Sequence, residues 1–195
     1  MESNMNKIQR VSRYFVTLFS FLAVALPLFL GIQWVLIDAQ TGFLPEAMRA
    51  LGMLERSVTT PEGAVALKTI PWTMSLKLLG LGADLVGALP LFISFFLLRT
   101  LFTHYVDGEI FSPRNAQLYK KLGLLYVMDA LLMTPLSQTL LILTATATNA
   151  PGHRYVSVSF GTPNLSSLFY GMLVILVSWI MYEASQMKRE QDLTV

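Results

Sequence analysis

The sequence of 195 residues contains no cysteine and has little charge. Without cysteine, the chain can form neither a disulfide nor a thiolate metal site, and it has no thiol nucleophile. Charged residues make up only 13% of the sequence and hydrophobic residues 54%, which is more apolar than a typical soluble domain. The sequence has only two histidines and contains no zinc-protease, phosphate-loop or catalytic-triad pattern. We therefore expect no metal or other cofactor and no enzymatic activity.

Four long apolar segments account for most of the hydrophobic residues. Each is about twenty residues long, which suffices to cross ~30 Å of hydrocarbon at ~1.5 Å per helical residue. So small a chain has no soluble interior that could cover four such helices. The sequence therefore predicts an all-α membrane protein with a single four-span domain over residues 1–195. Its transmembrane helices are expected at about residues 14–37, 78–102, 122–144 and 165–182.

The basic residues predict the orientation of this domain. Nine of the 14 lysines and arginines lie in the terminal segments and in the loop between the second and third spans. Since cytoplasmic loops are enriched in Lys and Arg, both termini are expected in the cytoplasm. The formal net charge is only +2, so we expect no direct binding of nucleic acid. The first apolar segment exceeds the ~7–15 residues of a signal peptide core and is expected to stay as an anchor.

The two outer loops are predicted to contain small elements of their own. Apolar residues recur at helical spacing from Leu44 to Val58, which predicts a short amphipathic helix at the membrane interface. Thr59 and Glu62 have the spacing of a capping box and predict another helix start. Residues 144–148 and 154–160 alternate in polarity around a turn. They predict a small outer β-hairpin.

Prolines lie inside three of the four predicted spans, at Pro27, Pro90 and Pro135. Each removes a backbone donor and clashes with the preceding turn, so each is expected to bend its helix. A bend can serve as a hinge or leave a gap for a ligand. The structural alternative is that neighbouring groups satisfy the freed carbonyls, as in many membrane helices.

Two carboxylates, Asp84 and Asp129, lie inside apolar segments. A charge in hydrocarbon is costly, so such residues usually face the helix bundle or a water-filled cavity. Their positions put the two carboxylates about 10 Å apart in depth, too far for the shared-proton pair of an aspartyl protease. Each is therefore either a proton or cation site or, as the structural alternative, a carboxyl group hydrogen-bonded to a neighbouring helix.

Two motifs lie in the segments predicted to be cytoplasmic. The motifs are Gly108-Glu109-Ile110-Phe111-Ser112 with Asn115 and Leu122-Gly123, and Glu190-Gln191-Asp192-Leu193-Thr194-Val195. Together with the four-span layout, they resemble the family called domain of unknown function 2975, whose members look like small four-span bacterial membrane proteins. The resemblance implies a multi-pass protein of the bacterial cytoplasmic (inner) membrane.

The resemblance also implies a partner. Members of the family often look like neighbours of small helix-turn-helix regulators, which suggests a membrane protein that holds a cytosolic transcription regulator. An alternative for the loop is purely structural, because Gly108 suits a tight turn and Ser112 can cap a helix that begins at Pro113. Under the regulatory hypothesis the partner-facing residues are Gly108, Glu109, Phe111, Ser112, Asn115, Glu190, Asp192, Leu193, Thr194 and Val195.

A second functional hypothesis is a small transporter or channel subunit. In it, Asp84 or Asp129 would bind an ion within the membrane. Four spans without a visible inverted repeat are too few for a complete carrier, so the protein would have to form a homo-oligomer. Under both hypotheses the lipid bilayer surrounds the spans.

Overall fold

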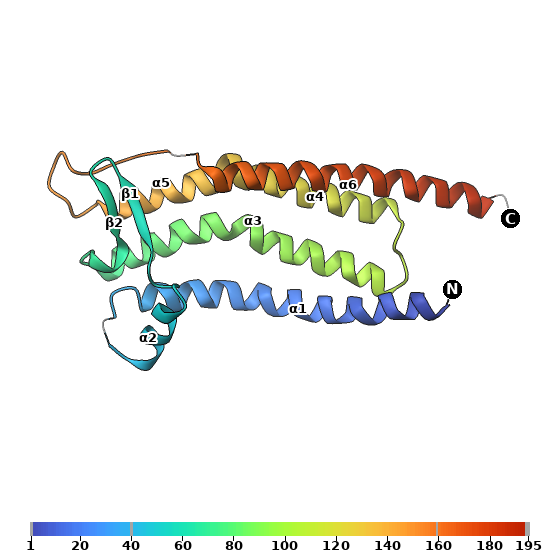
Figure 1. Ribbon diagram of the computed structural model, residues 1–195, viewed down its shortest axis with the longest axis horizontal. Coiled ribbons are helices and arrows are strands. Elements are labelled where there is room, and N and C mark those ends of the chain that lie inside the picture. The colour runs from blue at the N-terminus through green and yellow to red at the C-terminus, as the bar shows by residue number, and fades with distance from the viewer. Residues whose placement is uncertain (1, 40, 159, 194–195) are drawn as a thin grey trace. The chain divides into compact units, whose positions relative to one another are not determined.

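The computed structural model describes the backbone of residues 2–39, 41–158 and 160–193, and the side chains of residues 7–39, 41–158 and 160–191 (Figure 1). It is mostly helical, with a small two-stranded antiparallel sheet. Four helical segments are long and apolar enough to cross a membrane. The four predicted spans are therefore confirmed as helices, as expected of a multi-pass membrane protein.

The first long helix ends at Val35, just before the predicted end of its span, and the other long helices extend beyond both ends of the predicted apolar cores. The third span is interrupted by a π-helical turn, which separates two α-helical pieces. The long helices are α1 (Glu2–Val35), α3 (Met74–Val106), α4 (Pro113–Met128) with the π-helical turn Asp129–Met133 and α5 (Thr134–Ala145), and α6 (Thr162–Leu193). The short elements are α2 (Phe43–Ala50), β1 (Ser57–Thr60), β2 (Gly63–Ala66) and a 3-10 helix (Leu67–Thr69).

The chain divides into two compact units. Three of the four spans pass from one unit to the other. In α1 the boundary lies just before Pro27, in α3 it lies at Pro90, and in the third span it lies within the π-helical turn that precedes Pro135. The three prolines therefore lie where the packing partners of their helices change. The first unit comprises Met1–Ala25, Pro90–Leu131 and Thr162–Val195, and the second unit comprises Leu26–Leu89 and Leu132–Gly161.

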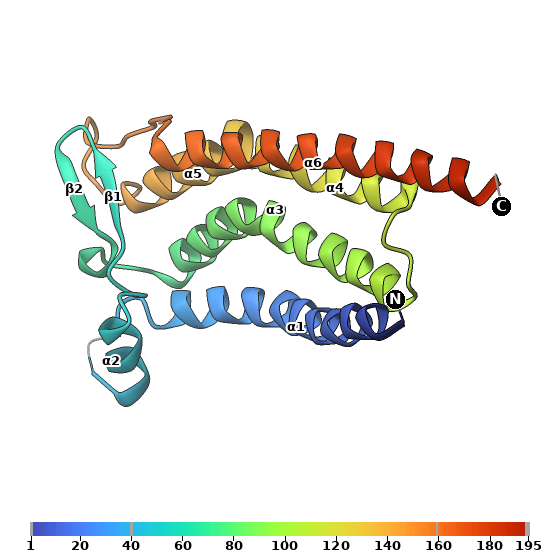
Figure 2. The ribbon, with the colours of Figure 1, turned by 45° about the vertical axis from the view of Figure 1, so that its right-hand side comes forward.

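The first unit is held together by close helix contacts. In Figures 1 and 2, α4 and α6 lie side by side. Gly123 and Gly171 meet at their closest approach, where a Cβ atom added to Gly123 would lie 2.8 Å from the Gly171 carbonyl oxygen. Small residues permit such backbone contact between membrane helices. On the other side of the unit, Phe15 of α1 stacks on Phe102 of α3 at 4.7 Å.

The second unit has a hydrophobic core built around Trp34. Its indole ring meets Trp72 edge-on at 5.1 Å and covers Gly80, where an added Cβ would lie 2.0 Å from the ring. Burial of two such large aromatic surfaces stabilises the unit. The other core members are Ile37, Val58, Leu67, Ile70, Ala83, Leu141, Ile142 and Ala145.

The small sheet lies at a place where we predicted helix. The predicted amphipathic helix ends at Ala50 instead of continuing to Val58, and Val58 lies in β1. The expected helix start at Thr59 and Glu62 is also wrong, because β1 and β2 pair with Thr60 opposite Gly63. Ser57 to Thr60 include three consecutive β-branched residues, which favour a strand. Gly63, with φ of +123°, completes the tight turn.

The predicted hairpin over residues 144–160 is wrong. Thr144 and Ala145 end α5, and a turn follows them. The next segment runs back along α5: the Tyr155 amide donates to the Thr146 hydroxyl at 3.1 Å, and the Thr139 hydroxyl donates to the Ser157 carbonyl at 3.0 Å. The side chains of Thr139 in α5 and of Thr146, directly after α5, thus provide hydrogen bonds that a partner strand would otherwise have made.

Candidate functional site

The loop between α3 and α4 is organised by Asn115, which is completely buried. Its side-chain amide donates to the carbonyls of Glu109 at 2.5 Å and Ile110 at 3.0 Å. Because these bonds fix the orientation of the amide, its oxygen must accept from Nδ1 of His104, at 2.7 Å. One side chain therefore holds the loop against the end of α3.

The predicted turn and helix cap are also confirmed. Gly108 has φ of +83°, in the left-handed region that glycine adopts without strain. The Ser112 hydroxyl accepts a hydrogen bond from the backbone N–H of Asn115 at 3.3 Å, and Pro113 occupies the first turn of α4. Gly108, Ser112 and Asn115 thus act mainly on their own loop. Phe111 differs from them, because 47% of its surface is exposed.

The loop meets the end of α6 across a pocket of about 390 Å³ in the first unit. Ser185 is a buried member of the pocket lining, and the Ser185 hydroxyl donates to the Tyr182 carbonyl. The structure therefore brings the loop motif next to the beginning of the C-terminal motif. The lining residues are Glu109, Phe111, Ser112, Pro113, Arg114, Ser185, Lys188 and Arg189.

The C-terminal motif itself is described only in part. Residues 190–193 continue α6, and Glu190 is exposed. The side chains of Asp192 and Leu193, and all of Thr194 and Val195, lie outside the described part of the chain. Of the residues expected to face a partner, the structure therefore places Glu109, Phe111 and Ser112 at the pocket.

The pocket carries an excess of positive charge. Arg114, Lys188 and Arg189 are exposed and line it together with a single acid, Glu109. Among the described side chains, no carboxylate forms an ion pair with any of the three cations. In the second unit, by contrast, lysine and arginine side chains form the ion pairs Arg56–Asp84, Lys68–Glu55 and Lys77–Asp38. The pocket is thus suited to an anionic group.

The buried carboxylate of Asp84 has two partners in the second unit. Arg56, which precedes β1, contacts both of its oxygens at 2.5 and 2.7 Å. The indole N–H of Trp34 donates to the same carboxylate at 2.6 Å. Asp84 is only 9% exposed, and ion pairing with hydrogen bonding offsets the cost of burying it. This geometry supports the structural alternative for Asp84.

Sequence reasoning missed both partners of Asp84. Arg56 lies in the segment for which the sequence predicted an outer amphipathic helix, and Trp34 lies near the end of the first predicted span. The available signal was a carboxylate in an apolar segment, which demands a partner without indicating which of several basic residues provides it. A neighbouring cleft of about 320 Å³ is lined by Arg56 and by Gln138 of α5, among others.

Asp129 belongs to the other compact unit, the first one. It begins the π-helical turn, where the carbonyl of the next residue, Ala130, accepts from the Asn164 side chain at 2.9 Å. This bond links the turn to the first residues of α6. A π-helical turn leaves backbone groups without their usual partners, and the Asn164 amide satisfies one of them.

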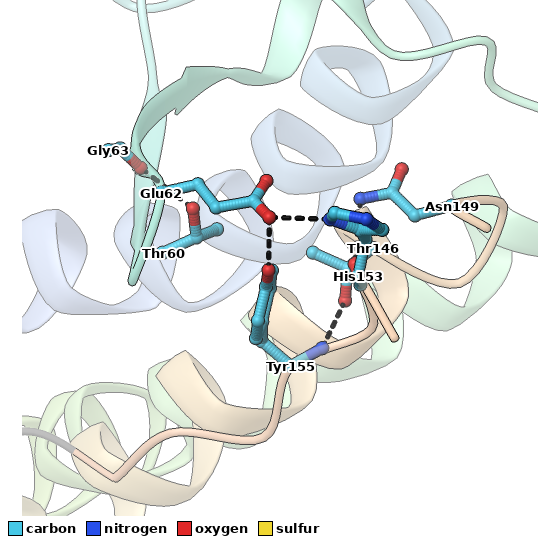
Figure 3. A network of polar contacts seen from close by, with 7 residues as sticks. All are labelled: Thr60, Glu62, Gly63, Thr146, Asn149, His153 and Tyr155. Carbon is cyan, nitrogen blue, oxygen red and sulfur yellow. Dashed lines mark hydrogen bonds and ion pairs between the residues drawn. The ribbon is translucent and has the colours of Figure 1, made fainter. Parts of the chain in front are cut away.

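A further polar network lies outside the spans, in the second unit (Figure 3). Glu62, in the turn between β1 and β2, contacts Nδ1 of His153 at 2.5 Å and accepts from the Tyr155 hydroxyl. The hydrogen bonds from Tyr155 and His153 lower the pKa of Glu62, and the bond to Glu62 raises the pKa of Tyr155. The described residues include no group of three or more histidines and carboxylates arranged to hold a metal ion.

The family model of proteins of unknown function named DUF2975 matches residues 62–195. The chain belongs to this family. No curated protein and no solved structure matches the chain. The matched range contains every residue that lines the pocket at the α3–α4 loop. It does not contain Arg56 or Trp34, the two partners of Asp84.

Proposed function

We propose that this DUF2975 protein is a non-enzymatic, multi-pass protein of the bacterial cytoplasmic membrane that binds a cytosolic protein. The binding surface is the end of the first unit, where the α3–α4 loop and the C-terminal part of α6 meet. One observation carries the proposal: the loop motif and the residues directly before the C-terminal motif, more than 70 residues apart in the sequence, line one pocket. Both segments are cytoplasmic in the orientation that the basic residues favour.

The partner that the family resemblance suggests is a small helix-turn-helix transcription regulator. Binding at the membrane would keep such a regulator away from its DNA sites. Release would then follow from any change that weakens the contact. The membrane protein itself needs no catalytic group for this role, only a surface that presents its contacts in a fixed arrangement.

The loop has the properties of such a surface. Asn115 and Ser112 hold its backbone through hydrogen bonds, and Phe111 remains half-exposed at the edge of the pocket. An aromatic side chain on a preorganised loop loses little conformational entropy on binding. Exposed aromatic residues beside a pocket are also common anchors of protein interfaces. Phe111 is therefore the residue on which we expect partner binding to depend most.

The transport hypothesis has less support. The Asp84 carboxylate is engaged by Arg56 and Trp34, so a proton or cation would have to compete with a guanidinium for it. No observation favours ion binding at Asp129 over a structural role.

The test is co-purification of the tagged full-length protein from its native host in mild detergent, followed by proteomics. We expect a small DNA-binding protein to accompany the wild type. Phe111→Ala and deletion of residues 190–195 should each abolish this association without lowering the yield of folded protein. Phe43→Ala is the matched control, because Phe43 lies in α2 of the second unit and is 89% exposed.

Two outcomes would contradict the proposal. One is recovery of the same partner with Phe111→Ala and with the deletion at wild-type levels. The other is recovery only of further copies of the chain or of other membrane proteins, which would favour the transport hypothesis.

A further inference from the structure

The three cations of the pocket come from two separate elements. Arg114 lies in the first turn of α4, whereas Lys188 and Arg189 follow each other on α6. Placing like charges around one concave surface is unfavourable unless an anion lies between them. Among the described residues, Glu109 is the only acid that lines the pocket. The pocket therefore has unmatched positive charge that a ligand can neutralise.

The distance of these cations from the bilayer indicates the kind of anion. Arg114 lies eight residues before Leu122, where the apolar segment begins, which corresponds to about 12 Å along the helix. Lys188 lies six residues beyond Tyr182, or about 9 Å. The head-group layer adds only about 5–7 Å on each side of the hydrocarbon. With the bilayer boundaries expected from the sequence, we therefore expect the pocket to lie beyond the depth of the lipid phosphates.

Other lysines are better placed for the lipid head groups. Lys120 and Lys121 lie one or two residues before Leu122, within about 3 Å of the hydrocarbon boundary. These are the residues that we expect to contact lipid phosphates, as basic residues next to a span commonly do. The cations of the pocket therefore serve a ligand from the aqueous phase.

The described part of the acidic tail does not line the pocket. α6 remains helical through Leu193, so the residues after Arg189 advance past the pocket. Figures 1 and 2 show α6 extending beyond the loop between α3 and α4. Glu190 is held on this helix and does not line the pocket.

We infer that the pocket receives a short acidic segment of the cytosolic partner, with carboxylates paired to Arg114, Lys188 and Arg189 and an apolar side chain against Phe111. This inference rests on the proposed function, because it names the chemistry of the partner at that site. Arginine forms two parallel hydrogen bonds with one carboxylate, and Arg114 and Arg189 can each provide this contact. Phe111 at the rim adds apolar contact that a free inorganic anion could not use.

The test uses the full-length protein in phosphatidylcholine nanodiscs. The probe is a fluorescently labelled peptide of six glutamates, and its binding is followed by anisotropy at low ionic strength, where charge pairing is least screened. The variant Arg114→Gln/Lys188→Gln/Arg189→Gln should bind at least about tenfold more weakly, as expected for loss of charge-assisted hydrogen bonds. A hexaglutamine peptide should not bind.

The matched control is Lys7→Gln/Lys120→Gln/Lys121→Gln, which removes the same charge from basic residues that do not line the pocket. It should bind the acidic peptide as the wild type does. Equal loss in this control, or failure of the wild type to bind hexaglutamate, would overturn the inference. So would direct binding of phosphatidylglycerol by the wild type that is lost in the pocket variant but kept in the control variant, because lipid would then be the ligand.

Co-purification with the pocket variant separates this inference from the proposed function. Loss of the partner with Phe111→Ala but not with the pocket variant would contradict the acidic segment and leave the proposed function intact. Retention of the partner by both variants would contradict the proposed function as well. A charge-swap experiment completes the test if both variants lose the partner. The acidic residues of the recovered partner are then changed to Lys, and Arg114, Lys188 and Arg189 are changed to Glu. Restored co-purification would support both the proposed function and the acidic segment.

Discussion

Arg56 and Asp84 form a two-pronged ion pair, in which the two terminal guanidinium nitrogens contact the two carboxylate oxygens at 2.5 and 2.7 Å. The pair joins the segment before β1 to the apolar helix α3 within the second unit. Trp34 of α1 adds a third contact to the same carboxylate. One buried carboxylate on α3 therefore binds side chains from two other segments that are distant in the sequence.

Removing Arg56 should destabilise the second unit. Arg56→Ala leaves the buried Asp84 carboxylate without its counter-charge, and we expect a loss of about 2–3 kcal/mol in unfolding free energy. Breaking a fully buried pair costs more, but the Arg56 side chain is about one-third exposed. Thermal unfolding of the purified protein in detergent measures the effect. The double variant Arg56→Ala/Asp84→Asn should recover part of the stability, whereas simple additivity of the two losses would show that the residues are not coupled.

Replacing Asn115 should loosen the α3–α4 loop. Asn115→Ala removes two hydrogen bonds to loop carbonyls and one to His104, and we expect about 2–3 kcal/mol of destabilisation. Hydrogen exchange should accelerate in residues 108–115. Gln117→Ala, at an exposed position on the same helix, is the control and should leave exchange in the loop unchanged. Unaltered protection of the loop in Asn115→Ala would show that Asn115 does not organise it.

A side chain at Gly123 should separate α4 from α6. An added Cβ would lie 2.6 Å from the Ile175 side chain and 2.8 Å from the Gly171 carbonyl oxygen, and the backbone contact cannot be relieved by a side-chain rotation. We expect Gly123→Ala to cost about 1–3 kcal/mol and to weaken binding of the acidic peptide, because the pocket is formed by these two helices. Gly31→Ala is the control, since an added Cβ there meets no atom within 4 Å. Equal stability of the two variants would disprove the close contact.

The contact between the β1–β2 turn and residues 153–155 should depend on pH at both extremes. Hydrogen bonds from Tyr155 and His153 lower the pKa of Glu62 from its ordinary value of 4.5. The ionised carboxylate therefore stabilises the contact above pH 4.5, and this stabilisation is lost as the pH falls through the lowered value. The pKa of Tyr155 is raised from 10.0 by its bond to Glu62, so its contribution is present below pH 10 and is lost as the pH rises through the raised value.

Limited proteolysis between residues 146 and 158 measures this dependence. Cleavage should be slow at neutral pH and faster in strong acid and strong base. Glu62→Gln should remove the acid limb and Tyr155→Phe the alkaline limb. An acid limb that persists in Glu62→Gln would assign the change to another group.

The four spans were predictable from sequence because hydropathy is a local property. A run such as residues 78–102 must be a helix in hydrocarbon, since its backbone groups have no other partners there. Local chemistry also determined the cap at Ser112 and the turn at Gly108, each of which depends on a few adjacent residues. The family resemblance depended on similarly short motifs.

The observed β1–β2 hairpin and the wrongly predicted hairpin at residues 144–160 show where local patterns were insufficient. Residues 57–66 fitted a helix start as well as a strand pair, and residues 144–160 alternated as a strand would. The choice depended on what lay beside each segment: Val58 packs into the core of the second unit, whereas Tyr155 and Ser157 bond to threonines in α5 and directly after it. Such contacts are made between segments that the sequence alone does not place together.

By itself, the sequence determined that this chain has four membrane-length helices, a loop that ends in a capped helix start, and two carboxylates in apolar segments that need partners. Only the tertiary structure decided that Arg56 pairs with Asp84 and that Arg114 lines one pocket with Lys188. The physical reason is that apolar burial acts on each segment separately, whereas ion pairs and pockets require two segments at one place. Several cations could have satisfied Asp84, and packing selected one of them.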